Sequence, residues 1–260
     1  SKRASYINSL LYEKEFELIH TKLDVSFDIP NELLFGKEWL TLRPYFYKTD
    51  KLVLDAKGMI INKIESRGKA LNFSYTSKKI YINLDKVYKK EDTLNLYIDY
   101  TADPSSVKQS GSNAITSAKG LYFINPKGIG SHKPTQIWTQ GETEASSCWF
   151  PTIESPNQKT TQEISIKVPS RYVTLSNGLL KSQTMEGDGE RTDYWVMSKK
   201  HAPYLFFMAI GEFSIVKDEW RGKEVSYYVE KEYENVARDI FGKTPRMMEF
   251  FSEITGVDFV

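Results

Sequence analysis

The sequence predicts a mainly β protein, with a large antiparallel sandwich or barrel-like domain followed by a short α-helical segment. Three observations support this class. Apolar and polar residues alternate with a period of two over most of the first 230 residues, as in strands with one buried and one solvated face. No helical segments intervene, which disfavours a parallel nucleotide-binding sheet. After about Glu232 the apolar spacing becomes helical.

Alternation marks the individual strands, and turn residues separate them. The clearest strand segments are residues 22–29, 71–75, 80–84, 94–100, 164–168 and 225–229. Asn177-Gly178 suits a type I′ hairpin turn, because both of its residues tolerate positive φ. Gly187-Asp188-Gly189 lies between a polar stretch and the strand-like residues 194–197. Many short strands with tight connections are therefore expected.

One segment breaks this rhythm. Residues 103–134 are rich in Ser, Gly, Asn and Lys and contain a single apolar run at 120–124. The composition predicts a long loop. Loops of this length inside a compact domain are often functional.

The end of the chain has two short helical patterns. The first stops at Gly242, and the second has Thr244 as N-cap and Pro245 as its first helical residue, with Gly256 ending it. Their apolar faces are formed by Val236, Ile240 and Phe241, and by Met247, Met248, Phe251 and Ile254. Because the apolar residues 257–260 follow at once, we expect further helical chain after Val260, in this polypeptide or its parent gene.

Composition excludes several classes of protein. The 260 residues are 40% hydrophobic and 13% aromatic, and 35 Lys and Arg oppose 34 Asp and Glu. Such a chain is globular rather than disordered, and it lacks the basic surface expected for binding nucleic acid. No apolar run approaches the roughly 20 residues of a transmembrane segment. The compartment stays open: cytoplasmic, or periplasmic or secreted if a signal peptide has been removed.

Common catalytic motifs are missing from these residues. The three histidines are isolated in sequence and none begins HExxH, so we expect no zinc or other metal to be bound by this chain itself. No G-x-S-x-G nucleophile elbow occurs. The single cysteine, Cys148, has no base nearby in sequence and is expected to be a small buried apolar residue.

Residues 133–151 form the most unusual stretch, with amide and carboxylate side chains between aromatic and proline residues. Gln140 and Glu142 would point to the same side if the backbone is extended there. An ionised Glu accepts charge-assisted hydrogen bonds and Gln adds a neutral acceptor, so the pair could receive an ammonium group. On spacing alone, a solvated polar loop is the favoured interpretation.

Several short motifs follow one another in a set order over nearly the whole chain. They are Gly120-Leu121-Tyr122, Thr139-Gln140-Gly141-Glu142, Phe150-Pro151, Pro156-Asn157-Gln158-Lys159, Ala202-Pro203-Tyr204-Leu205, Gly211-Glu212-Phe213 and residues 244–251. Their order and spacing resemble the amino-terminal domain of the aminopeptidase N family of zinc metallopeptidases. In that family a T-Q-x-E/Q motif is followed by F-P-C-x-D-x-P and then by a Lys before a strand.

The resemblance implies a fold and a role. The domain would be a saddle-shaped antiparallel β-structure over residues 1–231, and residues 232–260 would open a thermolysin-like catalytic domain of the same polypeptide. Glu142 would bind the free amino terminus of a peptide substrate, with Gln140 supporting it. Zinc would be a cofactor of the complete enzyme, whose HExxH and G-x-M-E-N motifs do not occur in these residues, so no catalytic residue is expected in this chain.

Three positions depart from the family pattern. The Arg expected after T-Q-x-E/Q is replaced within Ala145-Ser146-Ser147, Thr152 replaces the Cys of F-P-C, and Glu154-Ser155-Pro156 stands where D-x-P is usual. We interpret these positions as largely structural.

The leading hypothesis is therefore the substrate-recognition domain of a zinc aminopeptidase that removes amino-terminal residues from peptides. The alternative is a non-catalytic β-domain that binds peptides or scaffolds a partner protein. A third possibility is a relative that has adopted another hydrolase activity. The sequence leaves the preferred substrate residue and the oligomeric state open.

Overall fold

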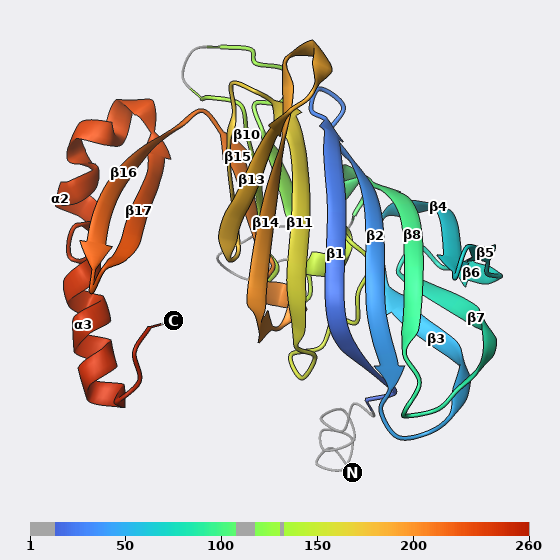
Figure 1. Cartoon of the computed structure of the whole chain (residues 1–260). Coiled ribbons are helices and arrows are strands. Elements are labelled where there is room, and N and C mark those ends of the chain that lie inside the picture. Colours follow the sequence, from blue (N-terminus) through green and yellow to red (C-terminus); the bar gives the residue numbers. More distant parts are fainter. Residues whose placement is uncertain (1–13, 108–117, 131–132, 260) are drawn as a thin grey trace, which may run out of the picture. The chain divides into compact units, whose positions relative to one another are not determined.

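The computed structural model describes residues 14–107, 118–130 and 133–259 (Figure 1). The chain divides into two compact units. One contains the residues up to Ser170 together with Thr174–Ile210, and the other contains Arg171–Val173 and the residues from Gly211 onward. Each unit is described separately. Within the described residues, no helix is both long and apolar enough to cross a bilayer.

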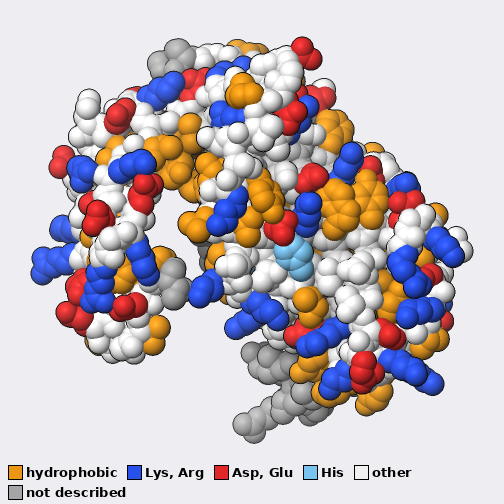
Figure 2. Space-filling view, viewed as in Figure 1, with side chains coloured by type: hydrophobic (Ala, Val, Ile, Leu, Met, Phe, Trp, Pro, Cys, Tyr) orange, Lys and Arg blue, Asp and Glu red, His pale blue; other side chains and the backbone are white. Residues whose placement is uncertain are grey.

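An eight-stranded sheet forms the largest element of the first unit and confirms the mainly β prediction. Its strand order is β13-β14-β11-β1-β2-β8-β4-β5. Alternate residues of its long strands are buried, because one face packs on the core. Figure 2 shows acidic and basic side chains interspersed over the other face, around β1, β2 and β8. The strands are β1 (Phe16–Asp28), β2 (Leu33–Pro44), β4 (Met59–Ser66), β5 (Lys69–Ala70), β8 (Leu94–Ala102), β11 (Thr160–Pro169), β13 (Leu179–Met185) and β14 (Glu190–His201).

One pair in this sheet departs from the expected antiparallel pairing. Strands β1 and β11 run parallel, with Leu23 opposite Ile164 and Val25 opposite Ile166. Alternation of apolar residues reports only which face is buried, so it cannot distinguish the two directions. The intervening chain of more than a hundred residues provides the long crossover that a parallel pair requires.

Two smaller sheets complete the first unit. A three-stranded sheet has the order β3-β7-β6, and a four-stranded sheet has the order β12-β15-β10-β9. The four-stranded sheet is tied to the large one by a hydrogen bond from Gln162 to Ser176 and by the edge-to-face rings of Phe27 and Phe123. The strands are β3 (Thr49–Asp55), β6 (Phe73–Tyr75), β7 (Lys79–Tyr88), β9 (Leu121–Ile124), β10 (Gln136–Thr139), β12 (Val173–Ser176) and β15 (Met208–Gly211).

The two predicted turns have different outcomes. Gly187-Asp188-Gly189 joins β13 to β14, which pair as an antiparallel hairpin. The prediction of a hairpin at Asn177-Gly178 is wrong, because the strands on either side, β12 and β13, lie in different sheets. Gly178 does have φ +85°, but the Asn177 amide bonds to the backbone at Leu205 and Phe207. Turn chemistry fixes the local bend and not the partner of the next strand.

The predicted long loop is partly structured. Residues 121–124 of its apolar run form β9, which pairs with β10, and Pro104–Ser106 form a 3-10 turn whose amides are capped by Asp103. Residues 108–117 and 131–132 of the predicted loop lie outside the described residues.

The second unit contains a hairpin and the predicted helices. Strands β16 (Phe213–Trp220) and β17 (Lys223–Glu230) pair antiparallel, and they precede a 3-10 helix (Lys231–Val236), α2 (Ala237–Phe241) and α3 (Thr244–Thr255). Gly256 ends α3 with φ +67°, as predicted. The N-cap prediction is wrong by one residue: Lys243 is the N-cap, and the Thr244 hydroxyl donates to the Phe241 carbonyl at 2.6 Å.

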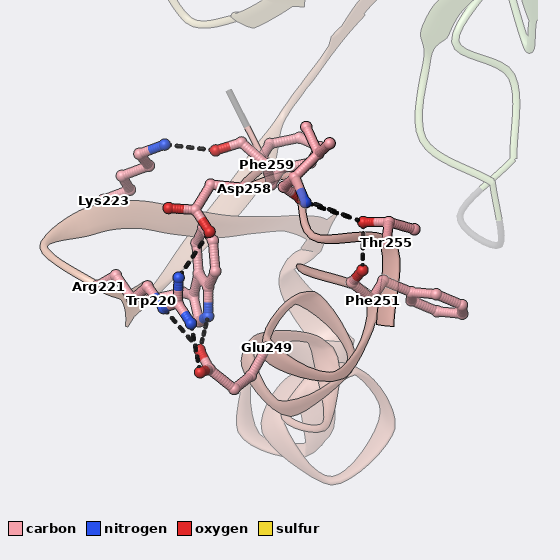
Figure 3. Close-up of polar contacts among 9 residues, drawn as sticks. Trp220, Arg221, Lys223, Glu249, Phe251, Thr255, Asp258 and Phe259 are labelled. Atoms are coloured by element: carbon pink, nitrogen blue, oxygen red, sulfur yellow. Dashed lines mark hydrogen bonds and ion pairs between the residues drawn. The ribbon is translucent and has the colours of Figure 1, made fainter. Parts of the chain in front are cut away.

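Arg221 connects the hairpin of this unit to its helix and its last residues. The guanidinium donates to Glu249 on α3 from Nε at 2.8 Å and to Asp258 from Nη1 at 2.7 Å, and Trp220 also donates to Glu249 (Figure 3). Because these contacts join the hairpin to the helix, the hairpin belongs to the second unit, whose main segment begins after Ile210. The boundary expected from the family resemblance, between residues 231 and 232, stays a prediction about domain identity.

Candidate functional site

The candidate site begins where β10 ends, at Thr139. The Thr139 hydroxyl is buried and accepts a hydrogen bond from the Met208 backbone amide at 3.0 Å. The next residue, Gln140, donates its own backbone amide to the Gly120 carbonyl at 2.9 Å. Backbone bonds from two different segments therefore fix the position of Gln140, while its side chain stays half-buried.

Gly141 is tightly enclosed by neighbouring atoms. A Cβ atom at this position would lie 2.2 Å from the Tyr204 carbonyl oxygen and 2.4 Å from the Ser146 Oγ. Both distances are shorter than any normal contact, so a glycine is required by close approach of the chain. The Ser146 hydroxyl donates in turn to the Pro203 carbonyl at 2.8 Å. The segment is thus wedged against residues 203–204.

A tight turn follows over residues 142–145 and leads into a 3-10 helix at Ser146–Cys148. The Ala145 amide donates to the Gly141 carbonyl at 2.9 Å. The Lys57 ammonium donates to the Glu144 carbonyl, and the Lys57 amide donates to the Ser147 carbonyl at 2.7 Å. The backbone that carries Glu142 is therefore held from both sides.

Glu154 holds the end of this turn through hydrogen bonds to its carboxylate. Its carboxylate accepts from the Ser146 amide at 3.0 Å and from the Ser147 amide at 2.8 Å. Burial raises the pKa of the Glu154 carboxyl, and the hydrogen bonds from Ser147 and the nearby Lys57 charge oppose that rise. A carboxylate here satisfies two amides at the start of a short helix that would otherwise lack partners. This structural role agrees with the interpretation of Glu154 as a structural departure from the family motif.

The two residues predicted to bind the substrate are Gln140 and Glu142. Glu142 is exposed and Gln140 is half-buried, with Gly141 buried between them. Strand β10 ends before Gln140 and the turn begins at Glu142, so a shared direction of the two side chains stays a prediction. Two residues before Gln140, the Trp138 ring stacks on Tyr122 with ring centroids 4.6 Å apart. The arrangement places an exposed carboxylate and a half-buried amide on a backbone that hydrogen bonds hold in position.

Two other predictions concern metal and thiol chemistry. Cys148 is fully buried, as predicted, and burial raises the pKa of its thiol to about 12, so it is a packing residue and not a nucleophile. Within the described ranges, no group of three or more His, Cys, Asp or Glu side chains could hold a metal ion. The donor set of these described residues therefore does not fit zinc.

Comparison with known proteins identifies relatives of the chain. The family model of the Peptidase M1 N-terminal domain matches residues 13–205. Human glutamyl aminopeptidase is 30% identical over 184 residues, which cover 66% of this chain and 19% of the relative. A probable aminopeptidase 2 of Sulfurisphaera tokodaii is 25% identical over 194 residues, covering 75% of this chain and 22% of the relative.

Solved structures share the fold. A mutant M1 zinc metallopeptidase from Deinococcus radiodurans, bound to a Tyr-Ser-Ala substrate, superposes with a TM-score of 0.73 at 16% identity. The alignment covers 92% of this chain and 54% of that one. The chain thus spans about a fifth of the length of the two curated relatives above and about half of the solved chain.

Proposed function

This chain belongs to the Peptidase M1 N-terminal domain family, and from that premise we propose that it recognises the substrate of a zinc-dependent aminopeptidase. In this role it holds the free amino terminus of a peptide while the remainder of the enzyme cleaves the first peptide bond. The observation that carries the proposal is the exposed Glu142 carboxylate, which follows a glycine that is wedged against Tyr204 and Ser146.

Glu142 acts as the acceptor for the substrate ammonium. An ionised carboxylate forms charge-assisted hydrogen bonds with an ammonium group, and Gln140 contributes a neutral acceptor or lines the pocket for the first side chain. Because neighbouring backbone bonds fix the turn, little ordering is needed when the substrate binds, and preorganisation of this kind favours affinity. The close packing of Gly141 against Tyr204 and the hydrogen bonds of the Glu154 carboxylate support that rigidity.

Zinc and the HExxH residues of the proposed enzyme lie outside this chain. Residues 232–260 open its catalytic domain, and α3 presents the surface that the rest of that domain covers. On α3, Met247, Phe250, Phe251 and Ile254 are all more than half exposed. A cavity of about 210 Å³ is lined by Met247, Met248 and Phe251 together with Val257 and Phe259. A contiguous apolar face of this kind is typical of a surface buried by another part of a protein.

The test compares two glutamates of the same turn in the full product of the gene. Glu142→Ala is expected to reduce kcat/KM for peptides with a free amino terminus by about 30-fold or more, because loss of a charge partner that becomes desolvated when the substrate binds costs roughly 2 to 5 kcal/mol. Glu144→Ala is the matched control, since Glu144 is exposed in the same turn, and it should change kcat/KM less than about three-fold. Equal small effects would refute the assignment of Glu142.

A second measurement separates the enzyme from a binding module. Hydrolysis of a panel of aminoacyl fluorophores is assayed with the full gene product and with the 260-residue chain, each with and without zinc. Activity confined to the longer, zinc-loaded protein supports the recognition role. Absence of activity from both would favour a β-domain that binds peptides or scaffolds a partner.

A further inference from the structure

The loop between β2 and β3 carries three consecutive aromatic residues followed by a lysine. It lies at the opposite end of β2 from the turn that joins β1 to β2 (Figure 1). The Tyr45 amide donates to the Glu15 carbonyl at 2.8 Å, which anchors the start of the loop beside β1. The residues that follow, Tyr45-Phe46-Tyr47-Lys48, line a cavity of about 760 Å³ together with Lys14, Lys51 and Asn157. This volume lies within the range of small-molecule sites, about 300 to 1,000 Å³.

The rings of this loop contact one another and remain open to solvent. Tyr45 and Phe46 meet edge to face with centroids 4.5 Å apart, and Phe46 and Tyr47 lie 6.5 Å apart. Phe46 is 65% exposed and Tyr47 is 82% exposed. Single exposed aromatic residues are ordinary, but adjoining rings in one cavity form a surface on which a planar ring can stack.

Lysine ammonium groups lie close to two of these rings. Lys14 Nζ lies 4.8 Å from the Tyr45 ring centroid, and Lys90 Nζ lies 5.6 Å from that of Phe46. The cavity lining contains three lysines, Lys14, Lys48 and Lys51, against the single carboxylate of Glu15, and Lys14 also forms an ion pair with Glu17 at 3.8 Å. Lys51 also donates to Asn83 at 2.6 Å, which holds its side chain in place. The local charge is therefore positive on a chain that is almost neutral as a whole.

We propose that this cavity binds a small phosphorylated compound that contains a planar ring, of the nucleoside phosphate class. The ring stacks on Phe46 and Tyr47, because aromatic side chains accept flat heterocycles with little dependence on their identity. The phosphates lie near Lys14 and Lys48, which act as point charges for phosphate. Stacking and charge each contribute, so a ligand with both groups binds more tightly than either group alone.

The test uses three probes on the full gene product by calorimetry: ADP, adenosine for the ring alone, and pyrophosphate for the charge alone. ADP is expected to bind at least about ten-fold more tightly than either control. Phe46→Ala and Lys48→Gln should each weaken ADP binding about ten-fold or more. Raising ionic strength from about 0.05 to about 0.5 M should weaken ADP binding strongly and adenosine binding little.

Matched variants and contrary outcomes complete the design. Tyr233→Ala and Lys181→Gln remove an exposed ring and an exposed ammonium elsewhere on the chain, and both should bind ADP as the wild type does. Equal affinity for the three probes, or wild-type affinity in both loop variants, would overturn the proposal. Binding of anionic phospholipid vesicles combined with indifference to ADP would also overturn it, in favour of a loop that contacts membranes.

Discussion

The Glu154 carboxylate accepts a hydrogen bond from the Ser147 backbone amide at 2.8 Å, and its other oxygen accepts from the neighbouring amide. Seven residues separate the two partners, yet the contact fixes the turn that carries Glu142. A conservative-looking departure from the family motif is thus one of the supports of the candidate site.

Replacing Glu154 should loosen this turn. Glu154→Ala leaves two amides at the start of a buried 3-10 helix without an acceptor, which costs about 1 to 3 kcal/mol of unfolding free energy. Glu154→Gln keeps one acceptor oxygen and should cost less. Urea unfolding measures both, with Glu144→Ala as the exposed control. Wild-type stability of Glu154→Ala would show that water replaces the carboxylate.

Gly141→Ala tests the close approach beneath the site. The added methyl would meet the Tyr204 carbonyl oxygen at 2.2 Å, so backbone must move, and overpacking of this kind costs about 1 to 3 kcal/mol. The displacement should also lower kcat/KM for peptide substrates, since it shifts Gln140 and Glu142. Gly187→Ala is the matched control, because a Cβ there meets nothing within 4 Å. Equal stability of the two variants would contradict the packing.

Replacing Glu38 by an apolar residue should increase the unfolding free energy. This side chain is completely buried in β2, and neither carboxylate oxygen has a hydrogen-bond partner among the described residues. Burial raises the pKa of the Glu38 carboxyl well above its ordinary range. The folded protein therefore keeps a proton that the unfolded chain releases, and stability falls as pH rises from the unfolded pKa through the folded one.

The experiment replaces the carboxyl by an apolar group. Glu38→Leu should raise the unfolding free energy at pH 7 by roughly 1 to 3 kcal/mol and reduce the decline in unfolding free energy as pH rises above the unfolded pKa of about 4. Glu38→Gln should gain less, because it leaves a polar amide buried. Loss of stability in Glu38→Leu would mean that the carboxyl is hydrogen-bonded to internal water.

Asp193 should behave in the opposite way. Burial raises the pKa of this carboxyl, but hydrogen bonds from Arg191, Thr174 and Gln183 outweigh that effect and leave the pKa lowered. Arg191 binds both carboxylate oxygens, with Nε and Nη2 at 2.6 and 2.9 Å. The stabilisation is therefore present above the unfolded pKa, near about pH 4, and is lost as pH falls through the folded pKa.

Asp193→Asn should cost about 3 kcal/mol at pH 7, because it removes the buried carboxylate charge of the ion pair with Arg191. The difference from wild type should shrink as pH falls below about 4, because the unfolded carboxyl takes up a proton there and the folded carboxyl does so only at lower pH. Urea unfolding at pH 7 and pH 3 measures this change. A difference that is independent of pH would mean that packing, rather than charge, is lost in the variant.

Much of the fold could be predicted because burial of one strand face is recorded in local alternation. Leu23 and Val25, or Ile164 and Ile166, are buried at the positions that the period-two pattern selects. The C-terminal glycine of α3 was also predictable from local sequence, since Gly256 adopts the left-handed conformation that glycine favours. Family motifs located Gln140 and Glu142, although their spacing alone favoured a polar loop.

Other features depend on residues that are distant in sequence. Nothing near Asn177 reveals that β12 and β13 join different sheets. The alternation of Leu34, Leu40 and Leu42 does place Glu38 on the buried face of β2, but only the folded structure shows that its carboxyl lacks a hydrogen-bond partner among the described residues. The rings at 45–47 gain their significance only when Lys14 and Lys90 approach them.

The sequence by itself therefore determined the strands, the helices and the family to which the candidate site belongs, because these follow from local periodicity and ordered motifs. Tertiary structure alone decided the parallel pairing of β1 with β11, the close packing of Gly141 and the hydrogen bond from the Ser147 amide to Glu154. The reason is physical: strand pairing, close packing and hydrogen-bond satisfaction are properties of groups that folding brings together from separate parts of the chain.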